Sequence, residues 1–221
     1  MKPVRLLFGV LIVGCAAGQM GATTIAVANY SFEQVPVVYG SYSANNIPSW
    51  NFTGFVSTYH PTTTEISGGV PDGVNVASVA ANSSIWQTLG TTLTGNTIYS
   101  LKVGVGERTD IPSPGYVVSL FAGVNLLASE SSQTLISGSF VTSTIIYNAS
   151  AVDPYLGQAL TIQMSVGGIT NQTEFDNVRL DATATGAPEP GTFGFLGLGV
   201  GLVGWKVRRR TAKARLSPRF K

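Results

Sequence analysis

Between residues 24 and 181 the sequence shows no helical periodicity, and short apolar or alternating runs recur there instead. Gly, Pro, Asn and Ser separate these runs, a pattern that predicts strands joined by turns. In Tyr99–Val105, for example, every second residue is apolar, so those side chains are expected to share one face of a strand. The predicted strands are Thr24–Phe32, Trp50–Ser57, Val74–Ala80, Ser84–Thr91, Ile98–Val105, Tyr116–Ala122, Val124–Ser129, Ser139–Tyr147, Leu160–Val166 and Glu174–Ala182.

Ten short strands at this spacing predict an all-β protein, an antiparallel β-sandwich or jelly roll. A tight hairpin is expected at Phe121–Val124. The only cysteine, Cys15, precedes the predicted domain, so no disulfide can join its strands. The domain must therefore be held together by its core, for which about 155 residues are sufficient.

Both ends of the chain carry targeting patterns. Lys2 and Arg5 precede an apolar run and then small residues, which is the layout of a signal peptide for Sec export. Cleavage after Ala17 and cleavage after Ala28 both fit, and Cys15 lies in a context that also fits lipidation. The expected organisation is a signal peptide in 1–28 (cleaved between 17 and 28), a β-sandwich domain in 24–182, a linker in 183–190, a transmembrane helix in 191–207 and a basic cytoplasmic tail in 208–221.

The C-terminal apolar stretch Gly191–Trp205 has 15 residues and no charge. As a helix it would be about 22 Å long, which is short for a hydrocarbon core of about 30 Å. Eight of the last sixteen residues are basic, and such a cluster keeps the segment that follows a span in the cytoplasm. These features predict a marginal membrane span.

Charge is distributed unevenly along the chain. Residues 29–187 contain ten acidic residues and only three basic ones, Lys102, Arg108 and Arg179, for a net charge of −7. Binding to nucleic acid requires a basic surface, so an acidic body argues against a nucleic-acid partner.

The C-terminal segment resembles the PEP-CTERM sorting signal of bacterial exported proteins over residues 187–210. The resemblance rests on Pro188, Glu189 and Pro190, then the Gly-rich apolar stretch, then Arg208, Arg209 and Arg210. It implies processing by an exosortase, a membrane protease, and a destination at the cell surface or in the extracellular matrix. The same type of tail is also catalogued as the C-terminal segment of some ice-binding proteins, which implies no ice binding here.

The body resembles galactose-binding-like jelly rolls at both of its ends. Asn29-Tyr30-Ser31-Phe32-Glu33 is similar to their opening segment, and Phe175-Asp176-Asn177-Val178-Arg179-Leu180 to their closing strand. In related carbohydrate-binding modules the corresponding acids help to hold a structural calcium ion. The resemblance therefore implies a calcium site that includes Glu33 and Asp176. The alternative is that both are ordinary carboxylates at strand ends.

Exposed aromatic residues can stack on sugar rings, which makes them candidates for ligand binding. Tyr39, Tyr42, Tyr59 and His60 lie in loop-like sequence and are the expected ligand-binding residues, with extracellular polysaccharide as the expected partner. Trp86, within an apolar strand, is expected in the core.

Catalytic patterns are weak. The sequence has one histidine, no cysteine in the body and no G-x-S-x-G motif, so the expectation is a non-catalytic module and not an enzyme. The leading interpretation is an exported surface or matrix protein that associates with extracellular polysaccharide. The alternatives are a purely structural surface protein without a ligand, and a secreted hydrolase built around His60 or a pair of carboxylates.

Overall fold

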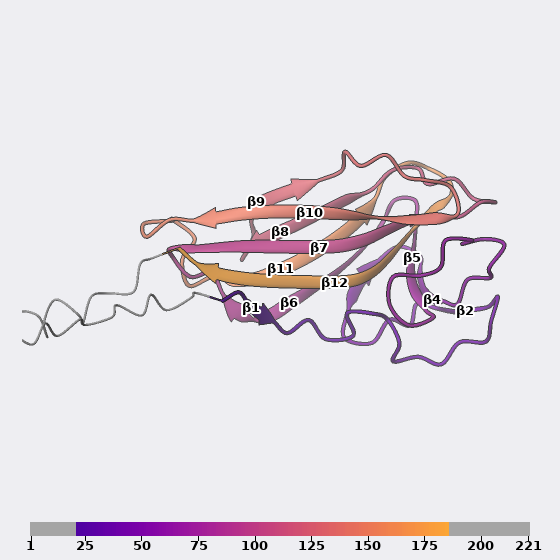
Figure 1. Cartoon of the computed structure of the whole chain (residues 1–221), viewed down its shortest axis with the longest axis horizontal. Coiled ribbons are helices and arrows are strands. Elements are labelled where there is room, and N and C mark those ends of the chain that lie inside the picture. Colours follow the sequence, from indigo (N-terminus) through magenta and orange to yellow (C-terminus); the bar gives the residue numbers. More distant parts are fainter. Residues whose placement is uncertain (1–20, 186–221) are drawn as a thin grey trace, which may run out of the picture. The chain divides into compact units, whose positions relative to one another are not determined.

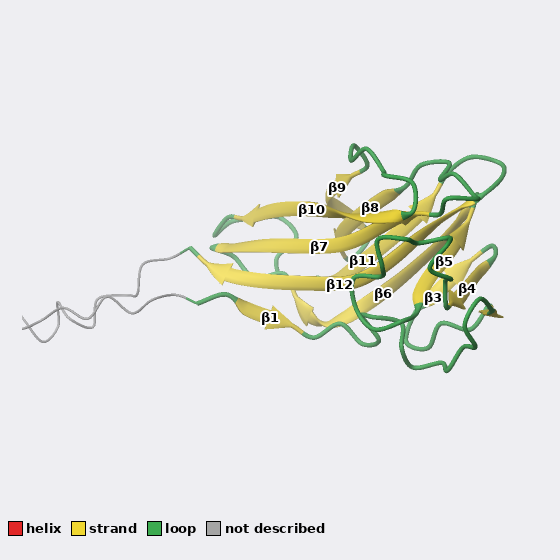
Figure 2. Ribbon diagram, turned by 45° about the vertical axis from the view of Figure 1, so that its right-hand side comes forward, coloured by secondary structure: helices red, strands yellow, loops and turns green. Residues whose placement is uncertain are grey.

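The computed structural model describes residues 21–185, and these residues form strands, turns and loops without a helix (Figures 1 and 2). It follows that no helix of this described part is long and apolar enough to span a membrane. Residues 1–20 of the predicted signal peptide, the Pro-Glu-Pro motif, the predicted apolar helix and the basic tail lie outside the described residues, whereas residues 21–28 of the predicted signal peptide lie within them.

Twelve strands form two antiparallel sheets. The seven-stranded sheet has the order β10-β7-β12-β5-β4-β2, with β1 paired to β12, and the five-stranded sheet has the order β3-β6-β11-β8-β9 (Figure 1). The predicted β-sandwich of jelly-roll type is thereby confirmed. The strands are β1 (Thr23–Ile25), β2 (Tyr42–Ala44), β3 (Asn51–Thr53), β4 (Val56–Tyr59), β5 (Val76–Ala80), β6 (Ser83–Thr92), β7 (Thr97–Glu107), β8 (Val117–Ala122), β9 (Asn125–Glu130), β10 (Ser139–Ala149), β11 (Ala159–Val166) and β12 (Gln172–Ala184).

A single apolar core lies between the two sheets, and the alternation of side chains along each strand builds it. Tyr99, Leu101, Val103 and Val105 are all buried, as their spacing predicts. Because alternate residues point away from this core, each sheet also has an outer face on which different chemistry can be displayed. The largest buried apolar side chains are Phe32, Ile85, Leu93, Tyr99, Leu101, Leu120, Leu160, Ile162, Met164, Phe175 and Leu180.

The first two predicted strands differ from the observed ones. Thr24–Phe32 is a strand only at its start, since Asn29 and Phe32 have positive φ angles of 49° and 59° and form a turn. Trp50–Ser57 divides into β3 and β4, which belong to different sheets. Gly54 allows this crossing, because its φ is +74° and a Cβ there would meet the side chain of Ser83.

Buried polar groups fix the irregular N-terminal segment to the sandwich. The Gln87 side chain accepts from the Ala28 amide at 2.8 Å and donates to the carbonyls of Ala28 and Ser49, both at 2.9 Å. The Trp50 indole N–H donates to the Asn29 carbonyl, and the Trp50 and Phe32 rings pack with their centroids 5.6 Å apart. These contacts satisfy backbone groups that no sheet partner reaches.

A bulge in β12 determines which residues of the closing strand point outward. The register with β7 shifts between Asp176 and Arg179, and Asn177 in the bulge has a φ of 51°. Phe175 and Val178 are both in the core as a result, while Asp176 and Arg179 lie on the outer side of the seven-stranded sheet.

Candidate functional site

An open cavity with aromatic walls lies on the outer face of the five-stranded sheet. Its volume is about 470 Å³. Trp86 of β6 and Phe121 of β8 come from strands on either side of β11, and Gln163 of β11 lies directly opposite Trp86 in the register. We call this surface the aromatic platform; its lining residues are Thr53, Ser84, Trp86, Phe121, Gly123, Val124, Thr161 and Gln163.

The polar groups of the platform are only partly engaged. Thr53 and Ser84 share a hydrogen bond at 2.9 Å, and Thr161 shares one at 3.0 Å with Thr88. Within the described part of the chain, neither the Gln163 amide nor the Trp86 indole N–H has a hydrogen-bond partner in the protein. An amide offers both a donor and an acceptor, so Gln163 can bind a polar group of a ligand held between the two rings.

Trp86 corrects a sequence-based expectation, because it is a half-buried residue of this outer face and not a core residue. Ile85, Gln87 and Leu89 take the inward positions of β6. A tryptophan among apolar residues does not by itself reveal which of the two faces it occupies. Phe121 and Gln163 were not predicted as site residues at all, although the two-residue turn that brings β8 back as β9 was predicted and is found at Gly123-Val124.

Four aromatic or histidine residues predicted to bind ligand are divided between different environments. Tyr39 and His60 line a cavity of about 330 Å³ together, with their rings 5.4 Å apart. Tyr42 is 60 % exposed on β2, outside that cavity. Tyr59 was expected to be exposed but is 4 % exposed. The Nδ1 of His60 lies 3.1 Å from the Val37 carbonyl, a backbone partner and not the carboxylate of a catalytic relay.

Tyr59 is buried because it belongs to a charged cluster on the outer face of the seven-stranded sheet. Glu65 accepts hydrogen bonds from the Tyr59 hydroxyl and the Thr62 amide, and it is also paired with Arg108. Arg108 lies over the Tyr59 ring at 4.9 Å and is paired with Asp110 at 2.7 Å. Desolvation and the bond to Glu65 raise the pKa of Tyr59 far above its usual value.

Glu174 extends this charged layer and is fully buried. One carboxyl oxygen accepts from the Gln172 amide at 2.9 Å, and the other, Oε2, has no partner among the described residues. Burial raises the pKa of Glu174 to about 7, although the Gln172 side chain and the positive charge of Arg108 both act to lower it. This face of the sandwich therefore holds buried charge under a loop.

The two predicted calcium ligands, Glu33 and Asp176, both contact the loop formed by residues 72–75. Asp176 accepts from the Asp72 amide at 2.8 Å, and Glu33 accepts from the amides of Val74 and Asn75 at 2.7 and 2.6 Å. Gly73 allows this approach, since a Cβ there would lie 2.3 Å from a Glu33 carboxylate oxygen.

The chemistry around this loop fits a hard cation. The Asn75 side chain donates to Glu33 at 3.0 Å, while its own oxygen, Oδ1, is buried without a partner in the described residues. Burial, together with the nearby charges of Asp72 and Glu33, raises the pKa of Asp176 to about 8, although its two oxygens accept hydrogen bonds from the backbone amides of Asp72 and Asn177. The described residues include no cluster of three or more His, Cys, Asp or Glu suited to a metal. Calcium, however, also accepts amide and backbone oxygens.

The fold defines a class: an antiparallel jelly roll of two sheets. Comparison with known proteins narrows this class, since the HpiC1-like family, described as HpiC1 cyclase, matches residues 23–181. The chain belongs to the HpiC1-like cyclase family. Comparison with curated protein sequences found no significant match.

Solved structures of cyclases from Fischerella agree with this assignment. An apo cyclase from Fischerella sp. is 25 % identical with a TM-score of 0.67, and the match covers 75 % of this chain and 98 % of that one. The Stig cyclase Fisc from Fischerella sp. TAU, in complex with (3Z)-3-(1-methyl-2-pyrrolidinylidene)-3H-indole, is 27 % identical with a TM-score of 0.68, covering 75 % and 100 %. A cyclase from the same source, in complex with 4-(1H-indol-3-yl)butan-2-one, is 27 % identical with a TM-score of 0.65, covering 74 % and 99 %.

These matches correct the expectation that the chain is not an enzyme, because the body belongs to a family of cyclases. Sequence motifs missed this relationship, since it depends on the whole domain and not on a short catalytic pattern. The resemblance to galactose-binding-like proteins extends only to the shared jelly-roll architecture.

The predicted sorting signal is confirmed. The PEP-CTERM protein-sorting motif matches residues 187–210, the same boundaries that the sequence pattern indicates. The chain is thus a cyclase-family domain followed by a sorting motif for which exosortase is the processing partner.

Proposed function

We propose that this chain is an exported enzyme of the cyclase family that binds a planar, largely uncharged substrate on the aromatic platform. The observation that carries the proposal is an open cavity of about 470 Å³ that Trp86 and Phe121 both line, with Gln163 directly opposite Trp86 in the register. Both named compounds in the solved cyclase complexes contain an indole ring system. Two aromatic walls without charge suit such a ring better than a cavity lined with cations.

The contribution of the platform to a ring closure follows from the residues that line it. None of the eight lining side chains is ionisable, so they orient the substrate rather than transfer a proton. Holding two reacting parts of one molecule close together lowers the entropic barrier to ring closure. The faces of Trp86 and Phe121 also stabilise positive charge that develops on the substrate, and the Gln163 amide fixes its orientation.

Binding of 4-(1H-indol-3-yl)butan-2-one to the purified body, residues 21–185, tests this proposal by calorimetry. The body is a suitable sample because it is a compact unit by itself and matches almost the full length of the solved cyclase chains. Trp86→Ala and Phe121→Ala should each weaken binding about 10- to 100-fold, since burying an aromatic side chain stabilises by about 1.5–3 kcal/mol.

Phe55→Ala is the matched control, because Phe55 is 47 % exposed and does not line the platform. Its affinity for the probe should equal that of the unchanged protein. Equal weakening by all three variants, or no saturable binding at all, would contradict the assignment of this site. Turnover is then followed by chromatography of indoles with a tethered reactive chain, because a cyclised product has the same mass as its substrate.

We also propose that calcium binds at the loop of residues 72–75 through Glu33, Asn75 and Asp176. In this position the ion would be structural, since it would fix the irregular N-terminal segment and the 72–75 loop against β12. The two carboxylates, the unpartnered Asn75 oxygen and the raised pKa of Asp176 support this assignment.

Export and processing complete the proposal. The chain would leave the cytoplasm through a Sec signal peptide, be held by its C-terminal apolar helix and be processed near Pro188-Glu189-Pro190. The intact mass of the protein from cells and from medium tests this, because processing removes the residues after the motif. Replacing all three motif residues by alanine should leave the full C-terminus on the cell-associated protein, while cleavage at the normal mass would contradict a role for the motif.

A further inference from the structure

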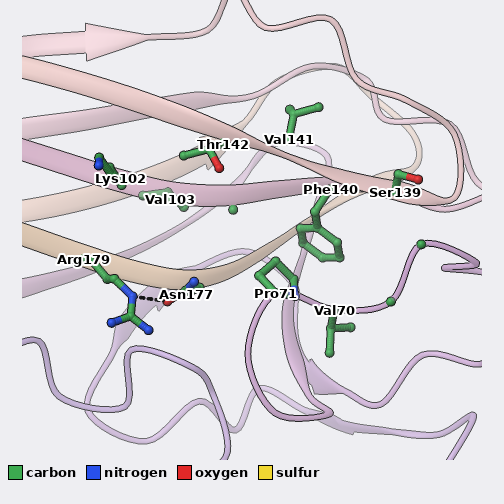
Figure 3. Close-up of a pocket in the computed structure, with 13 residues that line it drawn as sticks. Val70, Pro71, Lys102, Val103, Ser139, Phe140, Val141, Thr142, Asn177 and Arg179 are labelled. Atoms are coloured by element: carbon green, nitrogen blue, oxygen red, sulfur yellow. Dashed lines mark hydrogen bonds between the residues drawn. The ribbon is translucent and has the colours of Figure 1, made fainter.

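A second cavity, of about 450 Å³, lies on the outer face of the seven-stranded sheet. The chemistry of its lining differs from that of the aromatic platform. Its walls come from the loop around Val70 and Pro71 and from strands β7, β10 and β12 (Figure 3). Pro71 and Phe140 approach each other over Gly104, where a Cβ would lie 2.9 Å from Pro71 and 3.5 Å from Phe140. A glycine in β7 therefore creates the floor of this cavity, which has apolar side chains at one end.

The other end of the cavity is cationic. Lys102 and Arg179 both line it, and they are two of only three basic residues between residues 29 and 187. The third, Arg108, is already paired with Glu65 and Asp110. In a body with a net charge of −7, the concentration of available positive charge in one cavity is a specific feature of the fold.

The strand register pairs the two cationic residues of this cavity with each other. Lys102 of β7 and Arg179 of β12 are direct cross-strand partners on the same face. Like charges directly opposite each other destabilise a sheet, and the Asp72 carboxylate and the Tyr30 ring, 5.3 Å from the Arg179 guanidinium, offset this only at Arg179. Arg179, whose side chain is 52 % exposed, is paired with Asp72 at 3.2 Å. Lys102 forms no ion pair within the described residues.

Hydroxyl and amide groups complete the lining. Ser139 and Thr142 of β10 contribute hydroxyls, and Asn177 contributes an amide whose oxygen accepts from Arg179 at 2.5 Å, as drawn in Figure 3. Two cations, two hydroxyls and an apolar floor together match a ligand that carries a carboxylate, several hydroxyls and one apolar face. A sugar acid has all three.

We propose that this cavity is a binding site for an acidic sugar, with Lys102 holding its carboxylate and Arg179 adding to the positive charge of the wall. The site is independent of the aromatic platform, so the cyclase proposal and this one can fail separately. The proposal adds a second, anionic ligand to a protein whose substrate site is uncharged.

Calorimetric titration of the body with galacturonate and with galactose, at low salt and a fixed calcium concentration, tests the proposal. Galacturonate should bind and galactose should not, since the two differ at the carboxylate. Lys102→Gln should weaken binding at least 10-fold and Lys102→Arg should retain most of it. Raising the salt concentration to about 0.2 M should also weaken binding, because it screens the charges.

Ser129→Asp is the matched control, because it adds the same change of −1 to the net charge on β9, away from the cavity. This variant should bind galacturonate as the unchanged protein does, and Lys102→Gln should still bind the indole probe. The proposal is overturned if inorganic phosphate binds as tightly as galacturonate, if Ser129→Asp weakens binding as much as Lys102→Gln, or if galacturonate does not bind.

Discussion

Part of the outer face of the seven-stranded sheet is covered by the loop of residues 61–75 and holds buried charge, whereas the outer face of the five-stranded sheet is open and uncharged around Trp86. Both faces lie on the same apolar core. Under this loop, Arg108 and Glu174 are buried and Glu65 is half-buried. On the open face, Gln163 has no partner in the described protein. Interactions beneath this loop should therefore determine stability, while those on the open platform should determine binding of the indole probe.

The largest expected effect on stability comes from Arg108→Met on the covered face. Removing one partner of a buried charge pair typically costs about 3–5 kcal/mol, and here Glu65 would lose its cation while Glu174 would lose its favourable neighbour. Urea unfolding of the body measures this loss. Arg179→Met, whose ion pair has a 52 % exposed side chain, should cost less than about 1 kcal/mol. Similar losses in the two variants would show that burial does not distinguish the pairs.

Calcium should have the next largest effect and also act on the covered face. At a calcium concentration about 100 times the Kd, binding to the folded state adds about 2.7 kcal/mol, which corresponds to a rise in Tm of about 5–10 °C for a domain of this size. Differential scanning calorimetry with calcium and with a chelator measures the shift. Glu33→Gln should reduce it strongly, and Glu107→Gln, a carboxylate that instead accepts from the Ser113 amide, should retain it. An unchanged Tm with calcium would contradict the site.

The sequence predicted the strands and the core but not the residues that form the open face. Alternation located the core and eight of the ten predicted strands, because the side-chain period of a strand is a local property. The sequence also singled out Glu33 and Asp176, which both contact the loop of residues 72–75, although their role as calcium ligands stays a prediction. The platform was missed, because Trp86, Phe121 and Gln163 belong to three strands whose neighbours are determined by topology. The outward positions of Thr161 and Gln163 are readable from the alternation in β11, but their proximity to Trp86 is not.

Tyr59 and Trp86 both show that residue type alone does not predict burial, and the two errors are opposite. Tyr59 was expected in an exposed loop and is buried, because Glu65, six residues along the chain, and Arg108, distant in sequence and just after the end of β7, are its partners. Trp86 was expected in the core and lies on the open face, because Ile85, Gln87 and Leu89 fill the inward side of β6. In both cases the residue type favours burial or exposure only weakly, and long-range packing decides.

A pH-dependent effect is expected at the edge where the two sheets meet. Glu130 of β9 accepts from the hydroxyls of Tyr116, at 2.8 Å, and of Ser143, on β10 of the other sheet. Burial opposes the charged form, but the hydrogen bonds from Ser143, Ser132 and Tyr116 outweigh it and lower the pKa of Glu130 to about 2. Because the folded-state pKa is depressed, this stabilisation is complete above about pH 4.5 and is lost as the pH falls toward 2.

Glu130→Gln should therefore destabilise the body by about 2 kcal/mol near pH 6 and by progressively less as the pH is lowered to 2.5. Urea midpoints across this range measure the difference. Ser143→Ala keeps the carboxylate and removes one donor, so its loss should be smaller and have the same pH trend. A difference between Glu130→Gln and the unchanged protein that stays constant with pH would contradict this role of Glu130.

The smallest expected effect on stability is at the platform, and two glutamines on opposite faces of the same sheet provide a matched test. Gln87 points inward and makes three hydrogen bonds to the N-terminal segment, so Gln87→Leu leaves buried backbone groups unpaired and should cost about 1–3 kcal/mol. Gln163→Leu should change the free energy of unfolding by less than about 0.5 kcal/mol, since its amide has no partner in the described protein.

The same Gln163→Leu variant should nevertheless weaken binding of the indole probe several-fold, because the ligand loses its polar contact. If Gln163→Leu instead destabilises the body as much as Gln87→Leu and leaves probe binding unchanged, then Gln163 supports the sheet and the platform has no polar anchor.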